Sequence, residues 1–318
     1  MSANEPPEPP VDADVDLSIR LGGLTLPNPV GTASGTFGKG LEFQPFYDVG
    51  ALGFVVVKTI TQEPRAGNPA PRLVETAGGM LNSIGLPNPG IEAYARDVLP
   101  QLRTLGAPLV INIAGHDPAS FATLAGILEK EDGIDALELN MSCPNVTGGM
   151  DFSTSPDGAR EVVSRVRDVT SRPLIAKLSP NVTDIRPIAV AAVEGGASAI
   201  SAINTLLGMA VDWRNRRPVL GRGVGGLSGP CIKPIALRIV RDLWRTVDVP
   251  VLGIGGIQSV DDAMEFLLAG ASGIQVGTAN YYNPRAAMDI LDGLPRCIRA
   301  LGASSVREIV GTLEDPRG

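Results

Sequence analysis

Short apolar runs alternate with longer amphipathic stretches along most of this 318-residue chain. The apolar runs are rich in Val, Ile, Leu and Ala, which is typical of parallel strands that are buried on both faces. We predict strands at residues 29–33, 53–57, 109–113, 136–141, 174–178, 199–203, 251–255 and 273–276. Apolar positions three and four apart predict helices at 91–105, 120–130, 156–169, 185–194, 233–247, 260–268 and 285–301.

This alternation predicts the fold class α/β, and eight strand–helix units in one chain favour a (β/α)8 TIM barrel. A doubly wound parallel sheet is the alternative. Residues 17–20 and 24–26 flank two glycines and predict an N-terminal hairpin before the barrel. The connections 59–89 and 206–232 are rich in Gly, Pro and Asn, and we expect them to be long loops over the C-terminal mouth.

The domain organisation follows from composition. No linker-like change separates the strand–helix units, so residues 17–312 are predicted to form a single barrel domain. Residues 1–16 are acidic and Pro-rich and predict a disordered tail, and residues 313–318 are expected to be a flexible C-terminus. With no signal peptide and no apolar run of membrane-spanning length, the chain is expected to be cytoplasmic.

Charge and the rarer residues narrow the function. The net charge is −7 and no Lys/Arg cluster is present, which argues against binding to nucleic acid or to an anionic membrane. The three cysteines, 143, 231 and 297, lack the spacing of a disulfide framework, a zinc site or an iron–sulfur site, so no metal is expected. The one histidine, His116, lies in a predicted turn and is interpreted as an exposed turn residue.

Polar residues or glycines follow every predicted strand. Because parallel strands end at the same mouth of a barrel, these residues are expected to form one ligand site. They are Ser34, Gly35, Lys58, Thr59, Asn112, Asn140, Cys143, Lys177, Asn204, Thr205, Gly255, Gly256, Gly277 and Thr278.

Two features of this set indicate a phosphorylated, anionic ligand. Glycines after the seventh and eighth strands are typical of a barrel's phosphate site. Lys58 and Lys177 lie within apolar strands, where an unpaired ammonium group is costly. Glu138 is the one strand carboxylate and cannot easily serve both, so an anion is expected at one of them. Flavin mononucleotide (FMN) fits, with Lys177 stabilising negative charge at the pyrimidine edge of the reduced ring.

Several motifs resemble those of the dihydroorotate dehydrogenase family. They include NSIGLPN at 82–88, NMSCPN at 140–145, AKLSP at 176–180 and LSG at 227–229, and the resemblance extends from about residue 17 to residue 311. Cys rather than Ser at position 143 resembles class 1, the soluble class. The stretch 204–209 resembles subtype B, whose members pair with an FAD and iron–sulfur subunit and pass electrons to NAD.

The resemblance implies oxidation of dihydroorotate to orotate in pyrimidine (UMP) biosynthesis. Cys143 would be the base that removes the C5 proton, and the flavin N5 would take the C6 hydride. The implied substrate contacts are Lys58, Asn82, Ser83, Ile84, Gly85, Leu86, Asn140, Asn145, Asn204 and Thr205. The implied FMN contacts are Ser34, Lys58, Thr59, Asn112, Asn140, Lys177, Ile203, Gly229, Gly255, Gly256, Gly277 and Thr278.

The resemblance also implies partners. We expect a homodimer of this chain that joins an FAD and iron–sulfur electron-transfer subunit in a heterotetramer with two copies of each. The alternatives are a fumarate-linked soluble dihydroorotate dehydrogenase and a related FMN-barrel enzyme that acts on uracil-type rings. A non-redox phosphate-binding barrel and a scaffold that only kept the fold are more distant possibilities.

Overall fold

The computed structural model describes residues 15–141 and 152–314, so the predicted residues Cys143 and Asn145 lie outside the described part. Eight parallel strands form one sheet, in which each strand neighbours the next one along the chain. They are β3 (Val30–Thr32), β4 (Val55–Val56), β7 (Leu109–Ile113), β8 (Ala136–Asn140), β9 (Leu174–Lys177), β10 (Ala199–Ala202), β15 (Val251–Ile254) and β16 (Gly273–Val276).

The sheet closes on itself between its first two strands. Gly31 forms a parallel bridge with Phe54, and the Gly53 N–H donates to the Val30 carbonyl at 2.9 Å. A Cβ atom on residue 31 would lie 2.3 Å from the Phe54 ring, so this crossing requires glycine. The closed order confirms the predicted TIM barrel and excludes the doubly wound sheet.

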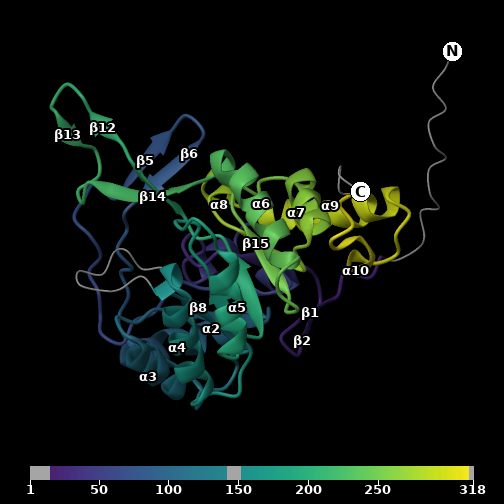
Figure 1. Ribbon diagram of the computed structural model, residues 1–318, viewed down its shortest axis with the longest axis horizontal. Helices are drawn as coiled ribbons and strands as arrows, with labels where there is room; N and C mark the ends of the chain where they lie inside the picture. Colours follow the sequence, from purple (N-terminus) through teal and green to yellow (C-terminus); the bar gives the residue numbers. More distant parts are fainter. Residues whose placement is uncertain (1–14, 142–151, 315–318) are drawn as a thin grey trace.

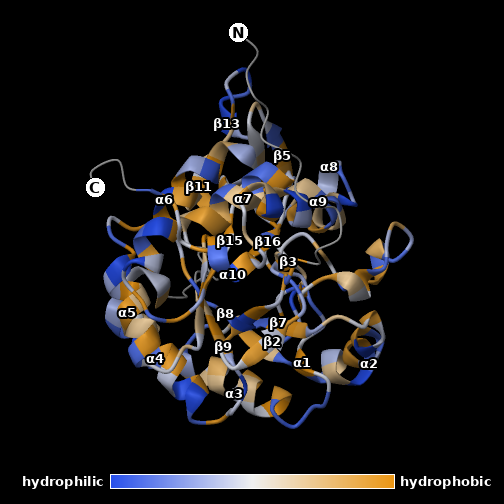
Figure 2. Cartoon of the chain, turned by 90° about the vertical axis from the view of Figure 1, so that its right-hand side faces the viewer, coloured by the Kyte–Doolittle hydropathy of each residue, from blue (hydrophilic) through white to orange (hydrophobic). Residues whose placement is uncertain are grey.

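Helices surround the barrel and turn their apolar faces toward it (Figures 1 and 2). The main ones are α3 (Pro118–Leu128), α4 (Pro156–Arg167), α5 (Arg186–Glu194), α6 (Lys233–Trp244), α7 (Val260–Ala269) and α9 (Ala286–Ala300). Shorter ones are α8 (Ala279–Tyr282) and α10 (Val306–Ile309). Each main helix lies within a few residues of its predicted position, because side-chain caps and apolar periodicity are local signals.

The helix predicted at 91–105 is not continuous. It consists of α1 (Ile91–Ala93), a π-helical turn over Tyr94–Val98, α2 (Leu99–Leu102) and a 3-10 turn over Arg103–Leu105. Pro100 has no N–H to donate to the preceding turn, which accounts for the widened helix immediately before it. After β3, the connection forms only the 3-10 turns Leu41–Phe43 and Val49–Ala51.

The predicted N-terminal hairpin is present as the antiparallel pair β1 (Ile19–Leu21) and β2 (Leu24–Leu26). It covers the N-terminal end of the barrel: a Cβ on Gly22 would meet Ser198, just before β10, at 2.5 Å. Figure 1 shows this hairpin at the opposite end of the molecule from the labels β5, β6 and β14. The hairpin therefore closes one end of the barrel and leaves the other for ligands.

The two long connections expected to be loops form a second sheet over the C-terminal mouth. Its antiparallel order is β11-β14-β6-β5, with β5 (Leu73–Thr76), β6 (Gly79–Asn82), β11 (Leu206–Met209) and β14 (Val224–Ser228). A further hairpin, β12 (Val211–Asp212) with β13 (Arg217–Pro218), projects beyond it (Figure 1). Local patterns missed these strands because they are short and interrupted by glycines. We call this four-stranded unit the mouth sheet.

Hydrogen bonds tie the first and last described residues to the barrel domain. Asp16, expected to be in the tail, accepts a hydrogen bond from the Val306 N–H at 2.9 Å and pairs with Arg307. Leu313, expected to be flexible, donates its N–H to the Leu268 carbonyl at 3.1 Å. None of the helices in the described residues has the length and apolarity needed to cross a membrane.

Candidate active site

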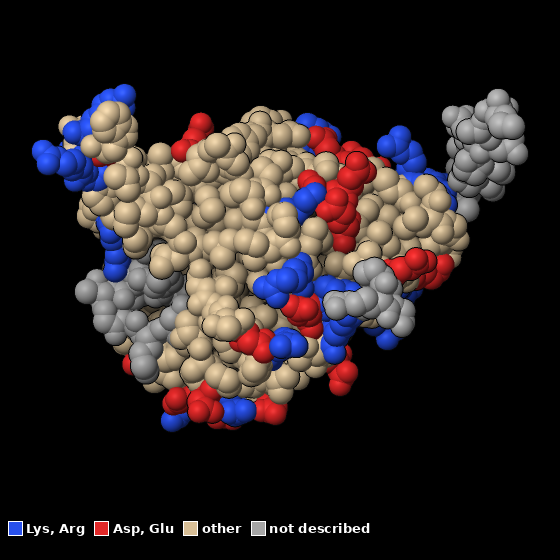
Figure 3. Space-filling view, turned by 45° about the horizontal axis from the view of Figure 1, so that its top comes forward, with Lys and Arg blue, Asp and Glu red and all other residues tan. Residues whose placement is uncertain are grey.

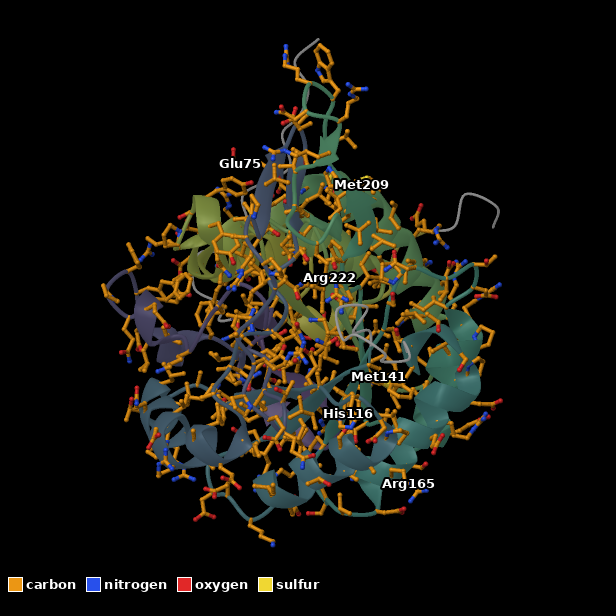
Figure 4. The ribbon with its side chains drawn as sticks, turned by 90° about the vertical axis from the view of Figure 1, so that its left-hand side faces the viewer. Glu75, His116, Met141, Arg165, Met209 and Arg222 are labelled. Carbon is orange, nitrogen blue, oxygen red and sulfur yellow. The ribbon has the colours of Figure 1, made fainter. Side chains whose placement is uncertain are left out.

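A cavity of about 320 Å³ lies between the C-terminal strand ends of the barrel and the mouth sheet. This position is where TIM barrels bind their substrates. Figure 4 faces this side of the molecule: Arg222 lies near the centre of the view, with Met209 and Glu75 on the strands above it and His116 below. The cavity is therefore built by two sheets, one beneath and one above.

Most of the predicted contact residues line this cavity. They are Ser34, Lys58, Thr59, Asn82, Ile84, Gly85, Leu86, Asn140, Lys177, Ile203, Asn204, Thr205, Gly229, Gly255, Gly256, Gly277 and Thr278. They come from seven of the eight barrel strand ends and from the mouth sheet with its flanking loops. The structure thus brings together residues that are up to 244 positions apart, although their individual roles remain predictions.

Two predicted contact residues lie behind the cavity wall. Ser83 is fully buried, and its hydroxyl accepts a hydrogen bond from the Asn68 amide at 3.0 Å. Asn112 is also fully buried and donates to Glu138 at 2.6 Å inside the barrel. Neither side chain is among those that line the cavity, and Asn112 lies one layer deeper in the barrel, opposite Glu138. The ligand contacts expected of both residues remain predictions.

Several lining residues were not predicted. They include Asn181, Leu207, Arg222, Val224, Ser228 and Tyr281. Asn181 follows the AKLSP motif by one residue, so its place could have been inferred from the strand end. It accepts a hydrogen bond from the Leu207 N–H at 2.9 Å and donates to the Thr205 carbonyl at 3.1 Å, which ties the mouth sheet to the barrel. Arg222 carries no comparable sequence signal.

Lys58 enters the cavity from the segment after β4. Its ammonium group contacts the Gly35 carbonyl at 3.5 Å, and no carboxylate among the described residues lies within ion-pair distance of it. Desolvation lowers the pKa of Lys58, and the positive charge of Lys177 lowers it further. An ammonium group held in this way favours an anionic ligand.

Lys177, the other lysine, has a protein partner. Its ammonium group lies 3.5 Å from Oε1 of Glu138, which is fully buried in the centre of the barrel. The expectation that Glu138 cannot serve both lysines agrees with this geometry, since Lys177 is paired and Lys58 is not. The anion is therefore expected at Lys58.

Glycines at the ends of β15 and β16 form a cradle at one end of the cavity. A Cβ on Gly277 would have its nearest neighbour 3.4 Å away, and one on Gly35 would meet nothing within 4 Å, so cavity space adjoins both backbones. Within the described residues, the backbone N–H groups of Gly256, Gly277 and Thr278 donate no hydrogen bond to another backbone group. Free N–H groups around open space suit a phosphate group, so these residues fit the expected phosphorylated cofactor.

Three amides, those of Asn82, Asn140 and Asn204, line the same cavity as Lys58. Asn204 donates to the Asn140 side-chain oxygen at 3.2 Å and accepts from the Thr205 N–H at 2.8 Å, while Asn82 donates to the Gly226 carbonyl at 3.3 Å. Each amide carries both donor and acceptor atoms. Together they can match the alternating N–H and C=O groups along the edge of a flat heterocycle.

The segment that carries Ile84, Gly85 and Leu86 is held rigidly against the loop before it. Gly85 has φ +80°, and a Cβ there would lie 2.5 Å from Asn68. The Asn68 N–H donates to the Ile84 carbonyl at 3.0 Å, and the Arg65 side chain reaches the Gly85 carbonyl at 3.4 Å. Two hydrogen bonds and a conformation that favours glycine thus hold the backbone of this wall against the preceding loop.

His116 is an exposed turn residue, as the sequence predicts. It lies in the turn before α3, 3.3 Å from the Asp117 carboxylate and outside the large cavity. Within residues 15–141 and 152–314, no group of three or more His, Cys, Asp or Glu side chains could hold a metal ion. The described lining of the large cavity offers ammonium groups, amides and backbone N–H groups.

The fold and the cavity define a TIM barrel with a ligand-sized cavity at its C-terminal mouth. The family model of dihydroorotate dehydrogenase matches residues 16–298. The chain belongs to the dihydroorotate dehydrogenase family, a family of flavin-dependent oxidoreductases. The predicted family, fold and enzyme class are thereby confirmed.

Named relatives are similar over nearly the whole chain. The "Dihydroorotate dehydrogenase B (NAD(+)), catalytic subunit" of Geotalea uraniireducens is 50% identical, covering 94% of this chain and 98% of the relative. The protein of the same name from Alkaliphilus oremlandii is 51% identical, with 94% and 99% covered. A crystal structure of the enzyme from Eimeria tenella in complex with ferulenol has a TM-score of 0.78 at 25% identity, covering 96% of this chain and 90% of that one.

Proposed function

We propose that this chain is the catalytic subunit of an NAD-linked dihydroorotate dehydrogenase, which oxidises dihydroorotate to orotate in pyrimidine biosynthesis with FMN as its cofactor. The observation that carries the proposal is the Lys58 ammonium group, which has no carboxylate partner among residues 15–141 and 152–314 and lies in a cavity walled by three amides. Orotate is a flat ring with an imide, a ring N–H and one carboxylate. Its charge complements Lys58 and its polar edges complement the amides.

The cofactor would occupy the rest of the same cavity. The backbone at Gly255, Gly256, Gly277 and Thr278 would hold its phosphate group, and Ser34, Thr59, Ile203 and Gly229 would line its ring and chain. Lys177 would face the pyrimidine edge of the ring. When bound, FMN supplies an acceptor for two electrons, which none of the protein side chains offers.

The protein groups have distinct tasks in this reaction. Lys58 binds the substrate carboxylate, and Asn82, Asn140 and Asn204 fix the plane of the ring. Cys143, three residues after the end of β8, takes the proton from C5 as general base; it lies outside the described residues. The mouth sheet and the 83–88 segment keep water from the reacting carbons.

Anaerobic mixing of the purified protein with dihydroorotate tests the activity. The protein should be yellow and its flavin absorbance should bleach, whereas dihydrouracil, which lacks the carboxylate, should leave the absorbance unchanged. Bleaching by dihydrouracil at a similar rate would favour the related enzymes that act on uracil-type rings. A colourless protein that binds no FMN would overturn the proposal and favour a non-redox barrel.

The electron acceptor defines the partner. The relatives are named catalytic subunits, so we infer a second subunit that carries FAD and an iron–sulfur cluster, in a complex of two copies of each around a homodimer of this chain. The isolated chain should reduce its flavin with dihydroorotate but reduce NAD poorly, and the partner should restore NAD reduction. Rapid fumarate reduction by the chain alone would move it to the fumarate-linked subtype, and rapid NAD reduction would show that no partner is needed.

A further inference from the structure

Glu138 is a fully buried carboxylate whose partners converge on it from four barrel strands. Its Oε1 accepts from the Asn112 amide at 2.6 Å and faces the Lys177 ammonium group at 3.5 Å. Its Oε2 accepts from the Ser201 hydroxyl at 2.9 Å and from the Gln275 amide at 2.8 Å. Both oxygens are thus fully hydrogen-bonded, which a buried charge requires.

This cluster joins the barrel interior to the cavity through one side chain. Among the residues that contact Glu138, Lys177 alone is both charged and part of the cavity wall. Asn112, Ser201 and Gln275 are each fully buried and do not line the cavity. These three side chains hold the Glu138 carboxylate from the barrel interior, so its position does not depend on a ligand. The carboxylate in turn holds the Lys177 ammonium group at the cavity wall.

We propose that Glu138 is a positioning residue that anchors Lys177 and partly neutralises the charge which Lys177 presents to the cofactor. This inference rests on the proposed function, because it takes the flavin ring as the group that Lys177 faces. A flavin ring becomes more negative when reduced, so the net positive charge beneath it determines how strongly the reduced form is favoured. Glu138 would hold that charge below a full unit and so keep the bound flavin easier to oxidise.

The Glu138→Gln variant removes the charge and retains the shape. The Asn112 and Gln275 side-chain oxygens have no hydrogen-bond partner, so either amide can rotate and accept from the new Gln amide. Lys177 would then face the flavin without a counterion. At an effective dielectric constant of about 20, one unit charge changes an equilibrium about tenfold at roughly 12 Å. We therefore expect the reduced flavin to be favoured at least about tenfold more, a rise of about 30 mV for a two-electron couple.

The test is a spectroscopic measurement of the two-electron potential of bound FMN in the purified protein at neutral pH, with a reference dye. Ser201→Ala is the matched control, because it removes one hydrogen bond to the same carboxylate and leaves the charge in place. Both variants should lower the melting temperature, but only Glu138→Gln should shift the potential. A potential equal to that of wild type in folded, FMN-loaded Glu138→Gln protein would overturn the inference.

A second variant covers failure of the first to fold. Asn112→Ala leaves Oε1 to Lys177 alone, so the ion pair tightens and the potential should fall, opposite in sign to Glu138→Gln. An unchanged or raised potential in Asn112→Ala would contradict the proposal. A wild-type protein that binds no FMN would instead refute the proposed function. Failure of the proposed function can therefore be told apart from failure of the inference about Glu138.

Discussion

Replacement of Lys58 by Met should stabilise the substrate-free protein while it abolishes tight orotate binding. In the free protein the Lys58 ammonium group is largely desolvated and repelled by Lys177, and its hydrogen-bond partner in the described part of the chain is the Gly35 carbonyl. Its pKa in the folded state lies below that in the unfolded state. The charged form therefore costs stability at pH values below the folded-state pKa, and this cost disappears as the pH rises toward the unfolded value.

The expected magnitude follows from the cost of a poorly satisfied charged group. That cost is about 1–3 kcal/mol, and the partial exposure of Lys58 places it toward the lower end, near ~1–2 kcal/mol. In a chain of this size each kcal/mol moves the melting temperature by about 2–4 °C. We therefore expect Lys58→Met to melt about 2–8 °C higher than wild type at pH 7. Binding of orotate should weaken by about 2–5 kcal/mol, which is the typical cost of breaking a buried charge pair.

Thermal unfolding of FMN-loaded protein with and without orotate measures both effects. Orotate should raise the melting temperature of wild type and leave that of Lys58→Met nearly unchanged. Lys39→Met, which removes a nearby lysine that is not part of the large cavity, controls for the loss of one positive charge. A Lys58→Met protein that melts below wild type without orotate, or that keeps the orotate-induced shift, would refute the reasoning.

Three further variants test other parts of the site. Cys143→Ala should bind FMN and orotate but reduce flavin about 10²–10⁴-fold more slowly in stopped-flow mixing. The rate of flavin reduction by wild type should rise as the pH approaches the ordinary thiol pKa of about 8.5. Flavin reduction at the wild-type rate in the variant would exclude Cys143 as the base. Lys177→Ala should purify with little FMN, and recovery with full flavin and normal turnover would show that the lysine serves only its ion pair. Gly85→Ala should destabilise the protein by more than ~1 kcal/mol and weaken orotate binding, because the backbone has φ +80° and the new Cβ would lie 2.5 Å from Asn68; denaturant unfolding that matches wild type would contradict this.

The barrel and its strand ends could be predicted because their signals are local. A strand buried on both faces is marked by its own apolar run, and the polar residue that ends it, such as Lys58 or Asn140, follows directly in sequence. Parallel topology then brings all the ends to one mouth without further information. The site was therefore predictable as a set of positions.

The contacts that depend on register or on distant pairing could not be predicted. Asn112 lies opposite Glu138 in the β7–β8 register, so its side chain enters the barrel centre and not the cavity. Asn82 pairs with Gly226, 144 residues further along, through strands that contain too few β-branched residues to be recognised. Local patterns carry no signal for either pairing, and the mouth sheet was consequently expected to be loops.

Figure 3 shows that positively charged side chains gather at the projecting β12–β13 hairpin, although the chain as a whole is acidic. They are Arg214, Arg216 and Arg217, so the expectation that the chain contains no Lys/Arg cluster is wrong for this hairpin. The hairpin also carries Trp213, which is 70% exposed, with the Arg214 guanidinium 4.4 Å from the centre of its ring. It follows β11 directly, and β11 contributes Leu207 to the cavity wall. The fluorescence of Trp213 therefore offers a reporter on a segment that follows the cavity wall directly, and Trp213 itself is not one of the residues that line the cavity.

The mouth sheet also constrains how this chain can evolve. The strands that flank the cavity come from two connections, and Asn82 lines the cavity only while β6 keeps its pairing with β14. Because side chains alternate along a strand, a slip of one residue would turn Asn82 to the opposite face. A single-residue insertion or deletion within either strand would therefore have to be matched in the other. The lengths of β6 and β14, which lie far apart in the sequence, should therefore change together during evolution.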